Sequence, residues 1–150
     1  MKRKILLIFI SLILSFNVLV SPALSQTASN CDRHEESVAF QIPSYKIQHQ
    51  GEAVLNIKVA YRITPDAIEQ KDYPDFMPMK NDIDRFFVNY PNETDYWEIV
   101  NNNLSKFILD KYPQISSLSI ELDVMPTSQE PFPHSSIVKS TRPQGCHLTI

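Results

Sequence analysis

The chain has 150 residues and a formal net charge of −3, with only two glycines against eleven prolines. This length allows one domain with a moderate core. No glycine-rich loop could wrap a phosphate, which excludes dinucleotide-binding and P-loop folds. No basic stripe is present either, so nucleic acid is not an expected partner.

The N-terminus has the pattern of a secretory signal peptide. A basic start at 2–4 precedes an apolar run, and residues 23–25 have the small-x-small spacing that a signal peptidase needs. We predict a signal at 1–25, cleavage after Ser25, and a secreted or periplasmic chain without stable membrane association. The alternative is a retained anchor, although an apolar run of about 16 residues is short for a bilayer. Cleavage leaves 11 basic against 17 acidic residues.

Two strands are expected at the start of the exported chain. Residues 38–49 alternate between apolar and other side chains, and Pro43 interrupts them, so a bend or bulge is predicted there. Residues 53–63 alternate without a break. The short segment 50–52 between them contains Gly51, which predicts a hairpin.

A loop and a short helix are expected next. Residues 66–78 contain acids and prolines without a sustained period, which is typical of a long connection. Ile83, Phe86 and Phe87 then recur at helical spacing. Asn81 or Asp82 is the predicted cap of this helix.

A longer helix and two strands complete the chain. The helix is predicted to open at Thr94 or Asp95, with Glu98 as capping-box partner, and to end before Pro113. Residues 117–124 alternate strictly, and 134–141 form a shorter strand. The order strand, strand, helix, helix, strand, strand predicts an α+β fold, a four-stranded antiparallel sheet with two helices packed on one face. The domain is expected at 38–141, between tails at 26–37 and 142–150.

The segment 97–138, together with the order of elements over 38–141, resembles one domain of the tunnelling fold (T-fold). This is the family of urate oxidase, dihydroneopterin aldolase and pyruvoyl-tetrahydropterin synthase. A single urate oxidase domain is nearest, because a helix ends at Tyr112 and Pro113, an alternating strand follows, and a Phe-Pro-His segment stands at 132–134. The resemblance implies subunits joined edge to edge around a tunnel, with flat purine- or pterin-like rings bound between subunits. Urate oxidase carries two such domains per chain and this chain can hold one, so the resemblance implies a homo-oligomer.

The resemblance also implies candidate ligand-binding residues, while the catalytic residues stay unknown. His134 stands where urate oxidase lines its pocket; the alternative is a surface histidine at a strand start. The threonine that urate oxidase places before its first helix, in a Thr-Asp pair, has no counterpart in this sequence; Lys80 and Asp82 stand in that region, and they also fit a solvated helix start with Asp82 as its cap. Glu98 is a candidate for the acid that anchors the ring, provided that its helix start faces a pocket.

Neither a metal nor a cofactor is expected. The four histidines form no H-x-H or H-x-x-x-H pair, neither cysteine lies in a C-x-x-C motif, and the zinc histidines of the pterin synthase are absent. Cys31 and Cys146 are predicted to form a disulfide in an oxidising compartment, within one chain rather than between chains. The alternative is two free thiols on loose tails.

Three functions are compatible with the sequence. The favoured one is a non-catalytic or ligand-binding secreted homo-oligomer with the tunnelling architecture. The second is an enzyme that acts on a purine- or pterin-like ring in an intersubunit pocket, with His134 and a nearby acid or lysine transferring protons. The third is a monomeric exported domain that binds another protein through its acidic surface.

Overall fold

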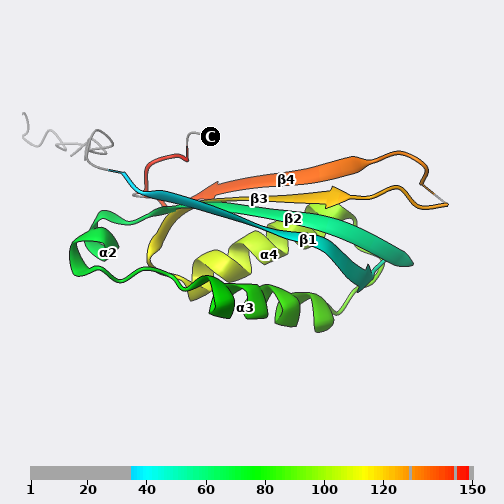
Figure 1. Ribbon diagram of the computed structural model, residues 1–150, viewed down its shortest axis with the longest axis horizontal. Coiled ribbons are helices and arrows are strands. Elements are labelled where there is room, and N and C mark those ends of the chain that lie inside the picture. Colours follow the sequence, from blue (N-terminus) through cyan, green and yellow to red (C-terminus); the bar gives the residue numbers. More distant parts are fainter. Residues whose placement is uncertain (1–34, 129, 144, 149–150) are drawn as a thin grey trace, which may run out of the picture.

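A computed structural model describes residues 35–128, 130–143 and 145–148 (Figure 1). The predicted signal peptide and Cys31 lie outside these residues. Within them, no helix is both long and apolar enough to cross a bilayer. The elements are β1 (Ser37–Gln48), β2 (Glu52–Ile63), α2 (Pro65–Gln70), α3 (Phe76–Val88), α4 (Trp97–Lys111), β3 (Ile115–Val124) and β4 (His134–Thr141).

The four strands form one sheet in the order β1-β2-β3-β4, and every neighbouring pair is antiparallel. The predicted α+β class and antiparallel sheet are therefore confirmed. The bulge predicted at Pro43 is also present, because the β1–β2 register shifts between Ile42 and Tyr45. Ser44 has a φ of 52° there, and its N–H donates to Asn56 Oδ1 at 3.0 Å.

The hairpin between β1 and β2 closes on residues with left-handed backbone. Gln50 and Gly51 have φ values of 52° and 100°, and a glycine adopts the second value without steric cost. The N–H of Gln50 donates to the carbonyl of Glu93 at 3.1 Å, and its side-chain amide donates to that of Asp95 at 2.9 Å. The hairpin is thus fastened to the α3–α4 connection.

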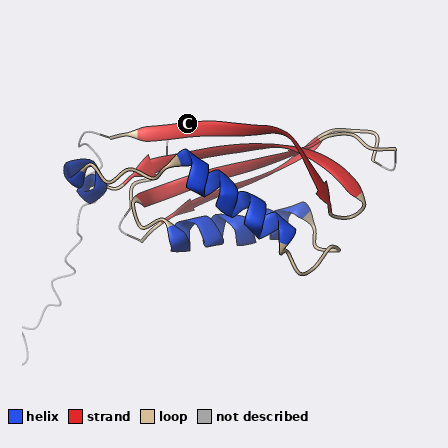
Figure 2. Ribbon diagram, turned by 60° about the horizontal axis from the view of Figure 1, so that its bottom comes forward, coloured by secondary structure: helices blue, strands red, loops and turns tan. Residues whose placement is uncertain are grey.

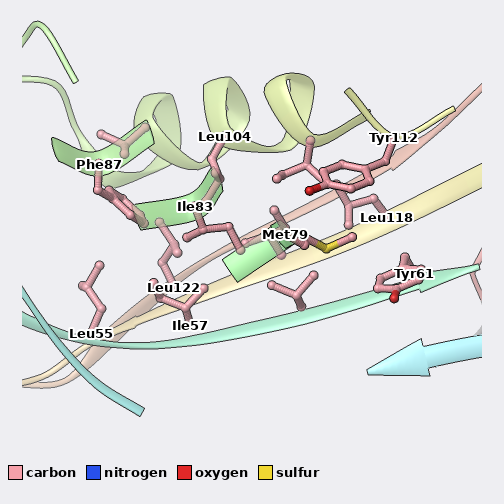
Figure 3. Close-up of a cluster of buried hydrophobic side chains, with 14 of the residues drawn as sticks. Leu55, Ile57, Tyr61, Met79, Ile83, Phe87, Leu104, Tyr112, Leu118 and Leu122 are labelled. Carbon is pink, nitrogen blue, oxygen red and sulfur yellow. The ribbon is translucent and has the colours of Figure 1, made fainter. Parts of the chain in front are cut away.

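Helices α3 and α4 cover one face of the sheet (Figures 1 and 2). The core lies between the two layers, where the alternating residues of β2 and β3 meet the apolar stripes of both helices (Figure 3). The largest fully buried side chains are Tyr61, Leu55, Ile57, Ile63, Met79, Ile83, Leu104, Ile108, Ile115, Leu118, Ile120 and Leu122.

The loop predicted at 66–78 is present only at 71–75, because α2 and the start of α3 occupy the rest, and the described part of the chain therefore has three helices where two were predicted. Thr64 caps the short α2 by accepting from the N–H of Ala67 at 3.2 Å. Asp75 caps α3, so neither Asn81 nor Asp82 does. The prolines misled the prediction, because Pro65 and Pro78 both stand in the first turn of a helix, where no intrahelical hydrogen bond is lost.

The start of α4 also differs from the prediction. Its N-cap is Tyr96, which makes no side-chain capping bond, and Glu98 lies exposed in the first turn without a capping-box partner. Asp95 instead accepts from the hydroxyl of Tyr90 at 2.7 Å and from Asn92 Nδ2 at 2.5 Å. Because Asp95 accepts from Tyr90 and Asn92, it does not cap α4, and the helix begins after Tyr96.

The end of α4 follows the prediction and is fixed by a distant residue. The helix ends at Lys111, and the guanidinium of Arg142 donates to the carbonyls of Leu109, Tyr112 and Ile115. A cation at this terminus satisfies carbonyls that the helix leaves unpaired and interacts favourably with its dipole. The segment after β4 is therefore attached to the helical layer.

Candidate functional site

His134 and Glu98 lie at the same end of the molecule. His134 is the first residue of β4 and pairs with Val124 at the end of β3. Asn101, one turn after Glu98, donates from Nδ2 to the carbonyl of Ser136 at 2.9 Å. The first turns of α4 therefore lie over the first residues of β4. The β1–β2 hairpin and the β3–β4 connection are at this end too (Figure 1).

Lys80 and Asp82 lie elsewhere. Asp82 is bonded to the other end of α4, where it accepts from Lys111 Nζ and from the hydroxyl of Tyr112, each at 2.6 Å. Lys111 stands 13 residues after Glu98, which is about 20 Å along the helix. The structure therefore does not gather the four candidate residues into one site.

The surroundings of Asp82 explain its role. Burial by itself opposes ionisation of this side chain, which is 3% exposed, but hydrogen bonds from Lys111 and Tyr112 and the charge of Arg85 outweigh it and lower the pKa. Burial and the bond to Asp82 raise the pKa of Tyr112 far above its usual range. At neutral pH the pair is a carboxylate and a phenol, which fasten α3 to the end of α4. Lys80 forms an ion pair with Asp84 on the same helix at 2.5 Å.

His134 is half-buried on an edge strand. Among the described residues, its Nδ1 is buried without a hydrogen-bond partner, and the nearest carboxylate oxygen, Oε2 of Glu130, lies 4.0 Å away. Phe132 stands beside the ring, with centroids 6.3 Å apart. Neither Lys80 nor Asp82 stands beside this imidazole.

The same end of the molecule holds a cavity of about 500 Å³. The β1–β2 hairpin, the start of α4 and the β3–β4 connection enclose it, and we call it the hairpin cavity. Its lining residues are His49, Gln50, Gly51, Glu52, Ala53, Trp97, Val124, Thr127, Ser128 and Glu130. Glu98 is not among them. Its predicted role as the acid that anchors a ring requires the helix start to present it to a pocket, and this cavity does not meet that requirement.

His49 and Trp97 form the aromatic wall of the hairpin cavity. They are 3% and 5% exposed, and their ring centroids lie 4.6 Å apart. Nε2 of His49 lies 2.7 Å from the carbonyl of Asp95, so this nitrogen carries the proton and donates. The histidine thereby links the hairpin to the segment that precedes α4.

Sequence reasoning missed both His49 and Asn101. His49 was weighed only as a metal ligand, and nothing in the sequence pairs it with a tryptophan 48 residues away. The burial of Asn101 could have been predicted, since the residue stands at helical spacing between Trp97 and Leu104 on the apolar face of the helix. It is fully buried and donates to the carbonyls of Ile120 and Ser136, which ties α4 to both β3 and β4.

The open face of the sheet, opposite the helices, carries a shallower hollow of about 460 Å³. Lys58 lines this hollow, and its Nζ lies 3.1 Å from Glu121 Oε1 and 2.8 Å from Asp123 Oδ2. Ala39 and Ile137 line it beside these charges. Over the part of the chain that the structure describes, no group of three or more His, Cys, Asp or Glu side chains is placed to hold a metal ion.

A scan against protein-family models and a search of curated proteins give no match for this chain. The resemblance to the tunnelling fold therefore stays a prediction, carried by the residues at 97–138 and by the order of elements. The disulfide between Cys31 and Cys146 stays a prediction as well, because Cys31 lies outside the described residues.

Proposed function

We propose that the chain is an exported, non-catalytic binding domain of the tunnelling type that assembles edge to edge with copies of itself. The observation that carries this proposal is the sequential strand order, which makes β1 and β4 the two edges of the sheet. They are 12 and 8 residues long, and neither has a second partner strand in the described part of the chain. Edge strands of this length expose backbone donors and acceptors that another strand can pair.

The side chains of the two edges support the same proposal. Val38, Phe40 and Ile42 of β1 point to the core side of the sheet yet are only half-buried, and Val138 of β4 is half-buried too. Pairing β1 of one copy with β4 of the next would remove much of this apolar surface from water, at about 25 cal/mol for each Å². Copies joined in this way would place their helices on the same side of a continuous sheet.

Binding without catalysis fits the placement of the candidate residues. His134 has neither Lys80 nor Asp82 as a neighbour, because Asp82 is bonded to the far end of α4 and Lys80 is paired with Asp84 on α3. One observation favours the enzyme alternative, namely that His134 starts an edge strand and that its buried Nδ1 has no hydrogen-bond partner among the residues that the structure describes. An acid or lysine from an adjacent copy would complete a proton-transfer pair acting on a purine- or pterin-like ring.

Amide hydrogen exchange tests the edge pairing directly. Paired edges predict that amides of β1 and β4 exchange more slowly at high protein concentration than at low concentration, while those of β2 and β3 do not change. Val138→Lys places a charge at the centre of an edge and should abolish the concentration dependence. Val88→Lys, at a residue that is 79% exposed at the end of α3, is the matched control. Exchange independent of concentration in the unmodified chain would refute the proposal.

A further inference from the structure

We propose that the hairpin cavity binds a small organic cation, an ammonium or guanidinium compound with an apolar stem. The cavity is built by one chain, so this inference goes beyond the edge assembly and does not depend on it. Its volume of about 500 Å³ falls in the range of pockets that take small molecules.

The charge of the lining selects a cation. Glu52 comes from the start of β2 and Glu130 from the β3–β4 connection, so two acidic residues line the cavity from different segments. None of the lining residues is a lysine or arginine. The N-terminus of α4 contributes roughly half a positive charge. The two negative charges of Glu52 and Glu130 are about four times as large, and Glu98 in the first turn of α4 offsets the helix charge further.

The carboxylates retain the capacity to accept from a ligand. The contact of Glu52 Oε1 with Gln48 Nε2 is long, at 3.4 Å. Oε2 of Glu130 lies 4.0 Å from His134 Nδ1, beyond hydrogen-bond distance. A carboxylate offers about four lone-pair sites, so both groups can accept several N–H bonds from an ammonium or guanidinium.

The remaining lining suits the rest of such a ligand. Trp97 and His49 supply the aromatic part of the lining. Ala53 and Val124 add apolar surface for a methylene stem. An anion would meet two like charges here, and a neutral apolar compound would form no hydrogen bonds with the carboxylates.

The cavity is also organised before any ligand arrives. His49 and Gln50 both bond to the carbonyl of Asp95, at 2.7 and 2.9 Å, which holds the hairpin against the start of α4. A site whose walls are already fixed loses less entropy when it binds. Only the wall that carries Glu130 comes from a longer connection.

Trp97 makes the inference testable, because it is the only tryptophan in the chain and belongs to the lining. Agmatine, which carries an ammonium and a guanidinium on a four-carbon stem, is titrated into the protein without its predicted signal, and fluorescence and calorimetric heat are followed. We expect a saturable response in both, absent with the neutral 1,5-pentanediol. Glu52→Gln and Glu130→Gln should each raise Kd at least about tenfold, since each removes charged hydrogen bonds.

The controls separate this site from other binding. Glu121→Gln removes a carboxylate of the open face and should leave Kd unchanged. Val138→Lys should also bind agmatine normally, because the cavity needs no second copy. Absence of calorimetric heat with agmatine would overturn the inference, and so would binding that survives the double substitution Glu52→Gln with Glu130→Gln. Loss of edge pairing with retained agmatine binding would contradict the proposed assembly alone.

Discussion

Replacing Asp82 by asparagine removes the charge that fastens α3 to the end of α4. The carboxylate is 3% exposed and accepts two hydrogen bonds of 2.6 Å, from Lys111 and Tyr112. Breaking a fully buried ion pair costs about 3–5 kcal/mol. Lys111 keeps 43% of its side chain in water, however, so its charge is not stranded in the variant. We therefore expect a loss of about 2 kcal/mol, the range of charged hydrogen bonds.

The pH dependence follows from the pKa of Asp82, which is lower in the folded chain than in the unfolded one. Such a group stabilises the fold fully above its unfolded pKa of about 3.9 and loses that contribution as the pH falls through the folded pKa. The stability difference between the unmodified chain and Asp82→Asn should be greatest at pH 7. It should shrink progressively below about pH 4.

Urea unfolding followed by circular dichroism measures this difference. Asp84→Asn is the matched control on the same helix, because its pair with Lys80 is partly exposed and should contribute about 0.5 kcal/mol or less. At pH 7, Asp82→Asn should also lower Tm by roughly 8 °C. The reasoning is refuted when the two variants are equally destabilised, or when the Asp82→Asn deficit is unchanged from pH 7 to below the folded pKa.

Three further predictions concern two packing contacts around the sheet and the predicted disulfide. Asn101→Leu leaves buried carbonyls of β3 and β4 without their donor and should cost about 1–3 kcal/mol in urea unfolding; an unchanged midpoint would contradict the role given to the amide. Gly145→Ala should destabilise by about 1–3 kcal/mol, because the added Cβ would lie 2.6 Å from the carbonyl oxygen of Ser116, and a neutral result in the same assay would show that this segment can move aside. Alkylation of the oxidised mature chain should find no free thiol; two reactive thiols would exclude the bond between Cys31 and Cys146, and a ladder of covalent multimers on a non-reducing gel would assign it to neighbouring chains.

The strands were predictable because alternation is a local property. Residues 134–141 form β4 as expected, and the bulge at Pro43 lies where the pattern breaks. Helix starts were less predictable, since Pro65 and Pro78 stand in first turns and resemble breakers in the sequence. The assignment of Asp82 as a cap failed for this reason, and the residue is buried in the middle of α3 instead.

The hairpin cavity could not be predicted from spacing. It depends on the tilted contact between the rings of His49 and Trp97 and on the lining that Glu52 and Glu130 contribute from separate segments. These are contacts between elements that are distant in sequence, so no periodic pattern encodes them. Trp97 is buried, and its position beside the cavity depends on how α4 packs against the sheet.

The most direct test of the proposed function is the absolute mass of the oxidised chain without its predicted signal, 26–150, by size-exclusion chromatography with light scattering. Edge pairing predicts a discrete multimer at high protein concentration that dissociates on dilution and that Val138→Lys converts to monomer. A monomer at every concentration would contradict the assembly and would leave His134 without the neighbour that the enzyme alternative requires. The chain would then be better described as a monomeric exported binding domain.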